Sequence, residues 1–300
     1  MPELPEVEIT ARRLGAAMAG ATIESTLAPG INALKTFDPP LHALDGRTVQ
    51  GVRRIGKHLV VDIGPGPASA GRVTGSGTSS DDLHVLCHLM SAGRLQLWDK
   101  RASLRDRTSR LLIRLDDGRE LRLREFGTKQ AAWVKVLTPG GLAADEAVAT
   151  LGPEAWPDPP ADLAALLEPH GARPLQAVLR DQRVIAGIGR SWVDEILWTA
   201  RLSPFKRGDD LDADEAARLR AAMLERLGGA VDHYEEVVHV PIPDKLPLPL
   251  RVHRHHGEPC PRCGTTIEAV HYEDYVLCYC PEEQTGGRVL KDRRLSRLLK

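Results

Sequence analysis

The sequence lacks a long hydrophobic run: none of its 300 residues lies in an apolar stretch of the roughly 18 residues that a membrane-spanning helix needs. We therefore expect no contact with a membrane. The first residues also lack the basic segment and apolar stretch of a signal peptide, which favours a cytoplasmic protein. The chain also lacks an excess of either charge, because it contains 40 Lys and Arg residues and 41 Asp and Glu residues. Total charge thus gives no indication of a polyanionic partner.

Cysteine is scarce, and four of the five cysteines lie close to the C-terminus. An odd, clustered set favours a metal site in a reducing compartment over a disulfide framework. Cys260 and Cys263 form a C-x2-C pair typical of a structural zinc site, and Cys280 is the next candidate ligand. Glu283 stands where a fourth cysteine would fall. Either Glu283 or Cys278 therefore completes the site, or the site has decayed and binds no metal.

Residues 1–135 have the pattern of one helix followed by antiparallel strands. Apolar residues recur at the spacing of a single helical face, namely Val7, Ala11, Leu14 and Met18. Two later segments alternate on either side of a glycine turn, at Gly56 and at Gly118, as β-hairpins do. One leading helix with several antiparallel strands predicts an N-terminal β-sandwich domain. A Pro- and Gly-rich linker follows at residues 136–160.

Residues 161–240 predict a helical domain. A short apolar helix ends at the glycines of residues 187–189, and a second apolar stripe follows, consisting of Trp192, Val193, Ile196, Leu197 and Ala200. We expect Ser191 to cap this second helix, with Asp194 three residues on. Such a pattern is typical of helix–turn–helix modules and also of an ordinary antiparallel helix pair. Residues 250–290 predict a hairpin around the cysteines, and residues 291–300 a basic tail.

Two segments are strongly basic although the whole chain is nearly neutral. Residues 94–110 and residues 284–300 each contain six basic side chains against one or two acidic ones. Taken alone, such runs are most often solvated faces. They indicate a nucleic-acid partner only beside a site whose chemistry uses phosphate.

The N-terminal residues contain an amine that can act as a nucleophile and carboxylates that can move protons. Removal of Met1 would leave Pro2 with a secondary amine whose pKa is about 8, low enough for part of it to be unprotonated at neutral pH. Such an amine can attack a sugar carbon and form an iminium ion, while carboxylates at Glu3 and Glu6 move protons. The alternative interpretation is an inert terminus in front of a capped helix.

Five segments occur in an order that resembles the formamidopyrimidine-DNA glycosylase / endonuclease VIII family of base-excision repair enzymes. They are PELPEVE, GKHL, LGPE, DQRVIAGIGRSWVDEIL and GEPCPRCGTTI, and together they span nearly the whole chain. The resemblance implies an α+β multidomain protein with an N-terminal β-sandwich, a helix–two-turn–helix domain and a zinc hairpin. It also implies a structural Zn²⁺ ion and a nucleoid-associated monomer that acts on double-stranded DNA with a damaged base or an abasic site.

The resemblance implies roles for several residues. Pro2 resembles the nucleophile that attacks C1′ of the damaged nucleotide, and Glu3 resembles the acid that protonates the sugar ring oxygen. Glu6 matches a supporting acidic position, and Lys57 matches a lysine that contacts the phosphate beside the lesion. The DNA-binding set implied in the same way comprises His88, Met90, Arg124, Phe126 and Arg190. Phe126 matches an aromatic wedge that fills the base stack after the damaged base is flipped out.

Four positions depart from the family pattern. Met90 is displaced by one residue from its usual place after His88, and in a strand such a shift would turn the side chain to the other face. The other three are Glu125 in place of an arginine, Arg190 in place of a phosphate-binding asparagine, and Tyr275 in place of the hairpin arginine. Arginine at position 190 can still bind phosphate bidentately.

Two functions from different classes follow. The first is a bifunctional DNA glycosylase and abasic-site lyase with a Pro2 Schiff base, followed by one or two elimination steps. The second is a non-catalytic binder of damaged DNA with the same fold, which the altered phosphate contacts suggest. Pro2, Glu3 and Lys57 favour the enzyme, because a pure binder has no use for them. The opening PELPEVE favours oxidised purines over oxidised pyrimidines as the lesion. Loops between the helical domain and the hairpin, around residues 228–250, are expected to line the base pocket.

Overall fold

The computed structural model describes residues 1–67, 81–103, 106–126, 130–171 and 173–290. The predicted basic tail at 291–300 lies outside these ranges. The chain divides into two compact units. Unit 1 contains Met1–Thr150 and Tyr234–Leu246, and unit 2 contains Leu151–His233 and Pro247–Lys300. No described helix is long and apolar enough to cross a membrane.

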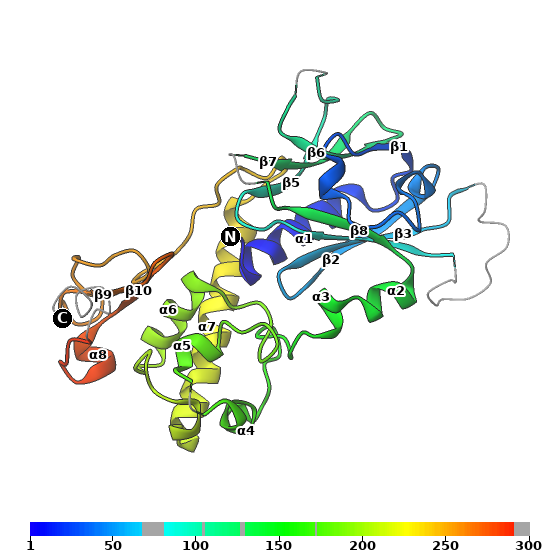
Figure 1. Cartoon of the computed structure of the whole chain (residues 1–300). Coiled ribbons are helices and arrows are strands. Elements are labelled where there is room, and N and C mark those ends of the chain that lie inside the picture. Colours follow the sequence, from blue (N-terminus) through cyan, green and yellow to red (C-terminus); the bar gives the residue numbers. More distant parts are fainter. Residues whose placement is uncertain (68–80, 104–105, 127–129, 172, 291–300) are drawn as a thin grey trace. The chain divides into compact units, whose positions relative to one another are not determined.

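Two antiparallel four-stranded sheets form the body of unit 1 (Figure 1). One sheet has the order β1-β6-β7-β5, with strands Ile23–Leu27, Ser109–Leu115, Glu120–Glu125 and Gly93–Trp98. The other has the order β2-β3-β4-β8, with strands Thr48–Ile55, His58–Gly64, Leu83–His88 and Trp133–Leu137. The predicted hairpins are confirmed as β2–β3 and β6–β7. Gly56 and Gly118 turn with positive φ, which glycine adopts without steric cost.

Helix α1 (Leu4–Met18) begins unit 1 and packs against β2, β3 and β5, so that it contacts both sheets. Its predicted apolar face is confirmed, because Val7, Leu14 and Met18 are fully buried. Each such side chain stabilises the fold by about 1.5–3 kcal/mol. Gly15 permits the close approach, since a Cβ atom there would lie 3.2 Å from the Val52 carbonyl oxygen. Short helices complete this part of the chain, namely η1 (Ile31–Ala33), η2 (Leu41–Leu44), α2 (Pro139–Ala144) and α3 (Glu146–Ala149).

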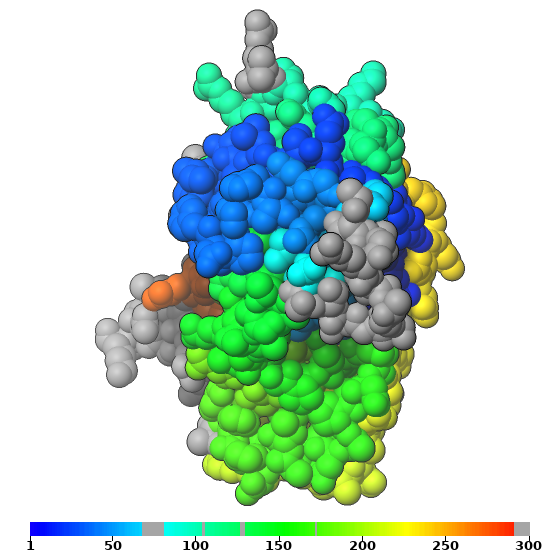
Figure 2. Space-filling model, turned by 90° about the vertical axis from the view of Figure 1, so that its right-hand side faces the viewer, coloured from blue at the N-terminus to red at the C-terminus, as the bar shows by residue number. Residues whose placement is uncertain are grey.

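Unit 2 is helical and ends in a hairpin. Its helices are α4 (Leu163–Leu167), η4 (Glu168–His170), α5 (Leu175–Val178), α6 (Arg190–Thr199), η5 (Gly208–Asp210), α7 (Ala213–Val237) and α8 (Pro281–Thr285). The hairpin pairs β9 (Glu268–His271) with β10 (Val276–Tyr279). Figure 2 shows α7, in yellow, alongside the green residues of the same unit. The last turn of α7, from Tyr234 on, belongs to unit 1.

The predicted apolar stripe of α6 is confirmed, because its members from Trp192 to Ala200 are buried. The predicted cap is wrong: Gly189 holds the N-cap position, and α6 begins at Arg190, one residue before Ser191. Asp194 does not serve the helix end either. It is buried, and its Oδ2 lies 2.7 Å from His253 Nδ1 and accepts the Cys278 backbone N–H at 3.0 Å. Tertiary partners, rather than local capping, therefore determine its place.

Candidate functional site

The first turn of α1 brings two carboxylates together beside Pro2. Pro2 is half-buried, while Glu3 and Glu6 are only 3% and 6% exposed. Glu3 is the N-cap, and the two glutamates form a capping box in which Glu6 Oε2 accepts the Glu3 backbone N–H at 2.7 Å. Each carboxylate thus satisfies a backbone donor at the helix start. The arrangement places two buried acids next to the residue expected to act as the nucleophile.

Tyr234, at the end of α7, joins this cluster, and the sequence patterns did not single it out. Its side chain is fully buried, and its hydroxyl donates a hydrogen bond to Glu6 Oε1 at 3.0 Å. Burial, together with the charges of Glu6 and Glu3, raises the pKa of Tyr234 well above its usual value. The phenol is therefore a neutral donor throughout the working pH range. No local motif could reveal this contact, because the two residues lie 228 positions apart.

Lys57 lies in the turn between β2 and β3 and is buried to 6% exposure. Arg54 connects this turn to α1. Its Nε atom donates to Glu8 Oε2 at 2.9 Å, and its Nη1 atom donates to the Gly56 carbonyl oxygen at 3.0 Å. The arginine side chain is itself 5% exposed. A partly buried ion pair therefore fixes the Lys57 turn relative to the helix that carries Glu3 and Glu6.

His88 ends β4 within an aromatic group. It is paired across the sheet with His58 and with Trp133, and the three ring centroids lie 4.7–5.7 Å apart. Burial, helped by the proximity of His58 and Lys57, lowers the pKa of His88 to about 4. The Met90 backbone N–H donates to His88 Nδ1 at 3.1 Å, so Nδ1 is the acceptor. At neutral pH the imidazole is consequently uncharged, with its proton on Nε2.

Met90 does not follow the strand alternation on which its prediction rested. Strand β4 ends at His88, and Met90 lies in the following turn with a φ of 49°. The expectation that a one-residue shift moves its side chain to the opposite sheet face is therefore wrong, since a turn has no period of two. Its side chain is half-buried.

Arg124, Glu125 and Phe126 have very different surroundings. Glu125 is 2% exposed, and its Oε1 accepts the backbone N–H groups of Ala131 and Ala132 at 2.6 and 2.8 Å. Its charge is thus turned inward and does not lie on the protein surface. Arg124 and Phe126 are half-buried, with the guanidinium carbon 4.7 Å from the phenyl centroid. The glutamate at position 125 therefore acts inside the protein, where it binds the backbone of residues 131 and 132.

Arg190 and Tyr275 contact each other in unit 2. The Tyr275 ring centroid lies 4.8 Å from the Arg190 guanidinium carbon and 4.4 Å from that of Arg180. Arg190 also donates to the carbonyl and carboxylate oxygens of Asp274. The tertiary fold thus brings together two of the departures, from α6 and from the hairpin, and adds Arg180, which the sequence patterns did not single out. The cluster offers two guanidinium groups held against one aromatic ring.

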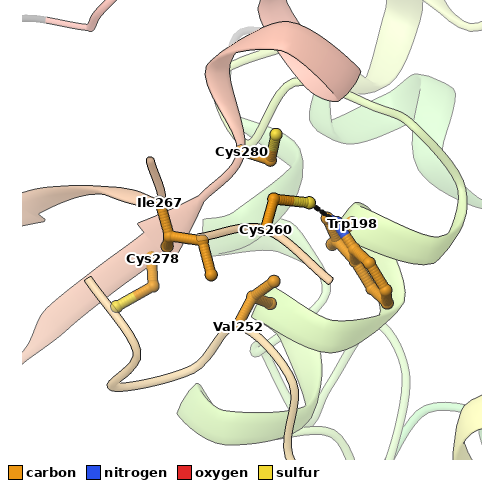
Figure 3. Packing of buried hydrophobic residues seen from close by; sticks show 6 residues of the cluster. All are labelled: Trp198, Val252, Cys260, Ile267, Cys278 and Cys280. Atoms are coloured by element: carbon orange, nitrogen blue, oxygen red, sulfur yellow. Dashed lines mark hydrogen bonds between the residues drawn. The ribbon is translucent and has the colours of Figure 1, made fainter. Parts of the chain in front are cut away.

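The sulfur atoms of the three predicted cysteine ligands lie close together. The Sγ atoms of Cys260, Cys263 and Cys280 all lie within 4.8 Å of one another. Trp198 Nε1 donates to Cys260 Sγ at 3.4 Å (Figure 3). Burial raises the pKa of Cys260, but donors from the backbone of Arg262 and Cys263 and from Trp198 outweigh it, so the pKa is lowered. These donors favour the thiolate form of Cys260, whereas burial raises the pKa of Cys280 to about 12. Three sulfur atoms at this spacing can hold a metal ion, because a coordinated thiol loses its proton to the metal.

Neither candidate for the fourth ligand lies in this sulfur cluster. Cys278 is buried, its sulfur accepts the Arg254 backbone N–H at 3.3 Å, and it points away from Cys260 and Cys280 in Figure 3. Glu283 Oε2 pairs with Arg262 at 2.8 Å and with Arg201 at 3.0 Å. Residues two positions apart share a face only within a strand, and β10 ends at Tyr279, before Cys280. Their spacing in the sequence therefore does not place Cys278 beside Cys280.

Two domain models of one protein family match this chain, one in its N-terminal part and one in its helical part. The models of the formamidopyrimidine-DNA glycosylase N-terminal domain and of its H2TH domain match residues 1–128 and 151–240. The formamidopyrimidine-DNA glycosylase of Deinococcus radiodurans is 30% identical over 295 residues, which cover 94% of this chain and 96% of that protein. The chain belongs to the formamidopyrimidine-DNA glycosylase family.

Other family members extend this comparison. An uncharacterised formamidopyrimidine-DNA glycosylase-like protein of Mycobacterium tuberculosis is 42% identical over 150 residues, covering 50% of this chain and 94% of that protein. The solved structure of the Lactococcus lactis glycosylase in complex with abasic-site DNA has a TM-score of 0.77 at 24% identity, covering 94% of this chain and 99% of that chain. At this identity the likeness shows the fold, and it confirms the predicted α+β multidomain architecture.

Proposed function

We propose that this protein is a DNA glycosylase and abasic-site lyase of base-excision repair, acting on double-stranded DNA with a damaged base or an abasic site. The main observation behind the proposal is the buried, reciprocally hydrogen-bonded pair of Glu3 and Glu6 directly after Pro2. Membership in the glycosylase family supports it, as do the complexes of the Lactococcus lactis protein with abasic-site and lesion-containing DNA. Such an enzyme works in the cytoplasm, where bacterial DNA lies.

The chemistry begins once Met1 has been removed. The Pro2 nitrogen attacks C1′, the glycosidic bond breaks, and the damaged base leaves with the bonding electrons. The N–H proton that Pro2 then loses neutralises the departing base. Glu3 donates a proton to the sugar ring oxygen, and ring opening gives an iminium ion between Pro2 and C1′. The iminium ion acidifies C2′, a carboxylate removes that proton, and the 3′ phosphate leaves in a β-elimination. Water then hydrolyses the iminium ion and releases Pro2.

Lys57 and His88 contact the phosphates around the lesion in this proposal. A lysine in a turn fixed by Arg54 supplies a localised positive charge where the phosphodiester becomes a leaving group. His88 contributes differently, because its neutral ring presents an Nε2–H donor without adding charge. The half-buried residues Arg124, Phe126 and Met90 act near the base stack after the lesion has been flipped out.

Unit 2 supplies the remaining contacts to DNA. Arg180 and Arg190, held against Tyr275, bind the phosphate backbone in place of the asparagine and arginine of the family pattern. Cys260, Cys263 and Cys280 hold a structural zinc ion, which keeps a hairpin with little core of its own folded. The zinc ion has no role in bond breaking.

The test is reductive trapping with borohydride on a duplex that contains one abasic site. The wild-type protein is expected to form a covalent adduct with DNA, because borohydride reduces the iminium bond. Pro2→Gly and a chain with an N-terminal extension are expected to form little or no adduct, whereas a C-terminal extension is the matched control and leaves trapping intact. Binding of abasic-site DNA without any adduct would instead identify a non-catalytic binder of damaged DNA.

The lesion class requires a second measurement. Duplexes that carry 8-oxoguanine, formamidopyrimidine, thymine glycol, dihydrouracil or an abasic site are compared for single-turnover excision. The opening PELPEVE segment leads us to expect faster excision of the oxidised purines. Faster excision of thymine glycol and dihydrouracil would reverse this assignment while leaving the Pro2 chemistry in place.

A further inference from the structure

The last turn of α7 is docked on α1 by several polar contacts within unit 1. The Arg13 guanidinium donates to the Val238 carbonyl oxygen at 2.7 Å and pairs with the Glu235 carboxylate at 2.7 Å. Arg12 pairs with the same carboxylate at 3.0 Å. Tyr234 adds the hydrogen bond to Glu6. Residues distant in sequence therefore support α1, the helix that begins two residues after Pro2.

Glu6 lies between Tyr234 and the backbone next to Pro2. Its Oε1 accepts the Tyr234 hydroxyl at 3.0 Å, and its Oε2 accepts the Glu3 backbone N–H at 2.7 Å. One carboxylate thus connects a fully buried tyrosine to Glu3, the residue that follows the expected nucleophile. Both bonds are short enough to limit rotation of the carboxylate.

The buried hydroxyl of Tyr234 is stabilised by its hydrogen bond to Glu6. A buried hydroxyl without a partner costs free energy, and a phenylalanine would fill the same apolar space without that penalty. Because the phenol stays neutral, the hydrogen bond has a fixed direction, from Tyr234 to Glu6. A neutral donor also stabilises the carboxylate form of Glu6 without adding a positive charge near the Pro2 amine.

We infer that Tyr234 is a positioning residue for the Pro2 nucleophile, acting through Glu6 and the Glu3 backbone. This inference rests on the proposed function, since it assumes that Pro2 forms the bond to the sugar. Tyr234 touches neither DNA nor the reacting atoms in this scheme. Its hydrogen bond orients the Glu6 carboxylate, Glu6 fixes the start of α1, and the start of α1 sets the direction of the Pro2 lone pair.

The test separates the rate of bond formation from DNA affinity. Tyr234→Phe removes only the hydroxyl, and we expect about a tenfold slower single-turnover formation of the borohydride-trapped adduct at saturating abasic-site DNA. The dissociation constant, measured with a duplex carrying a tetrahydrofuran abasic analogue, is expected to stay within about twofold of wild type. Thr10→Val is the matched control, because the Thr10 hydroxyl bonds the Glu6 backbone carbonyl oxygen instead of its carboxylate. Its trapping rate should equal that of wild type.

A second variant tests the route through Glu6. Glu6→Gln disrupts the bond to the Glu3 N–H, and the double variant with Tyr234→Phe should be no slower than Glu6→Gln alone, because both remove one connection. A wild-type trapping rate in Tyr234→Phe, even with a lower melting temperature, would show a purely structural tyrosine and overturn the inference. A rate loss explained by weaker DNA binding would overturn it as well. Binding of abasic-site DNA by the wild-type protein without any trapped adduct would instead refute the proposed function itself.

Discussion

The carboxylate cluster in unit 1 and the cysteine cluster in unit 2 are held together in different ways. Glu3, Glu6 and Tyr234 are connected by hydrogen bonds between protein groups, so the cluster is complete without any added ion. The cysteines supply three sulfur atoms from two separate segments, and neither candidate fourth ligand lies among them. The first site therefore depends on packing of helices, whereas the second depends, in our proposal, on a zinc ion bound by the three sulfur atoms.

The largest effect is expected from removal of the proposed zinc ion. A structural zinc site contributes on the order of 10 kcal/mol to folding of its domain. We expect Cys260→Ala, or treatment with a strong chelator, to unfold the hairpin while the sheets of unit 1 stay folded. Cys87→Ala is the matched control, because Cys87 is also buried but lies in β4 and does not belong to the cysteine cluster. The readouts are zinc content by mass spectrometry and limited proteolysis. Retention of one zinc ion per chain by Cys260→Ala would contradict the assignment.

Loss of a carboxylate should affect unit 1 less. Glu6→Ala removes a capping interaction and leaves the Glu3 N–H and the Tyr234 hydroxyl without their acceptor. We expect the free energy of unfolding to fall by about 2–4 kcal/mol, with the sheets intact. Chemical denaturation followed by circular dichroism measures this change. Exposed Glu236 on α7 offers a control, since Glu236→Ala should alter stability by less than about 0.5 kcal/mol.

Substitutions at position 283 test the fourth ligand directly. Because Glu283 pairs with Arg201 and Arg262, Glu283→Gln should leave the zinc content unchanged. Glu283→Cys should tighten metal binding about tenfold or more, since a fourth thiolate completes a tetrahedral site. Competition with a chromophoric chelator measures the affinity, and the absorption of the cobalt-substituted protein reports the number of thiolates. Loss of metal in Glu283→Gln would show that this carboxylate is a ligand after all.

The smallest expected effect concerns acid stability. The pKa of His88 is about 4 in the folded protein and about 6.5 in an unfolded chain, so the unfolded state binds the extra proton. The stabilising contribution is present above pH 6.5 and is lost as the pH falls toward 4. His88→Gln should therefore lose about 1–2 kcal/mol less stability than wild type between pH 7 and pH 5. Denaturation at both pH values measures the difference, and equal losses would contradict the lowered pKa.

Local patterns were sufficient for much of the fold. The apolar face of α1, the glycine turns at Gly56 and Gly118 and the stripe of α6 each depend on residues a few positions apart. Each was confirmed because secondary-structure periods act over such distances. Ser191 and Met90 show the limit of this approach. Gly189 already caps α6, and β4 ends two residues before Met90, and element boundaries such as these depend on tertiary packing.

Short ordered motifs were enough to indicate the family, the three clustered cysteines and the acidic segment after Pro2. Three other features became visible only in the folded chain: Tyr234 bonds Glu6, Glu125 faces inward, and Cys278 turns away from the sulfur cluster. Burial and hydrogen-bond partners of a side chain depend on which distant segments pack against it. Residues 6 and 234 share no local pattern, yet one hydrogen bond joins them.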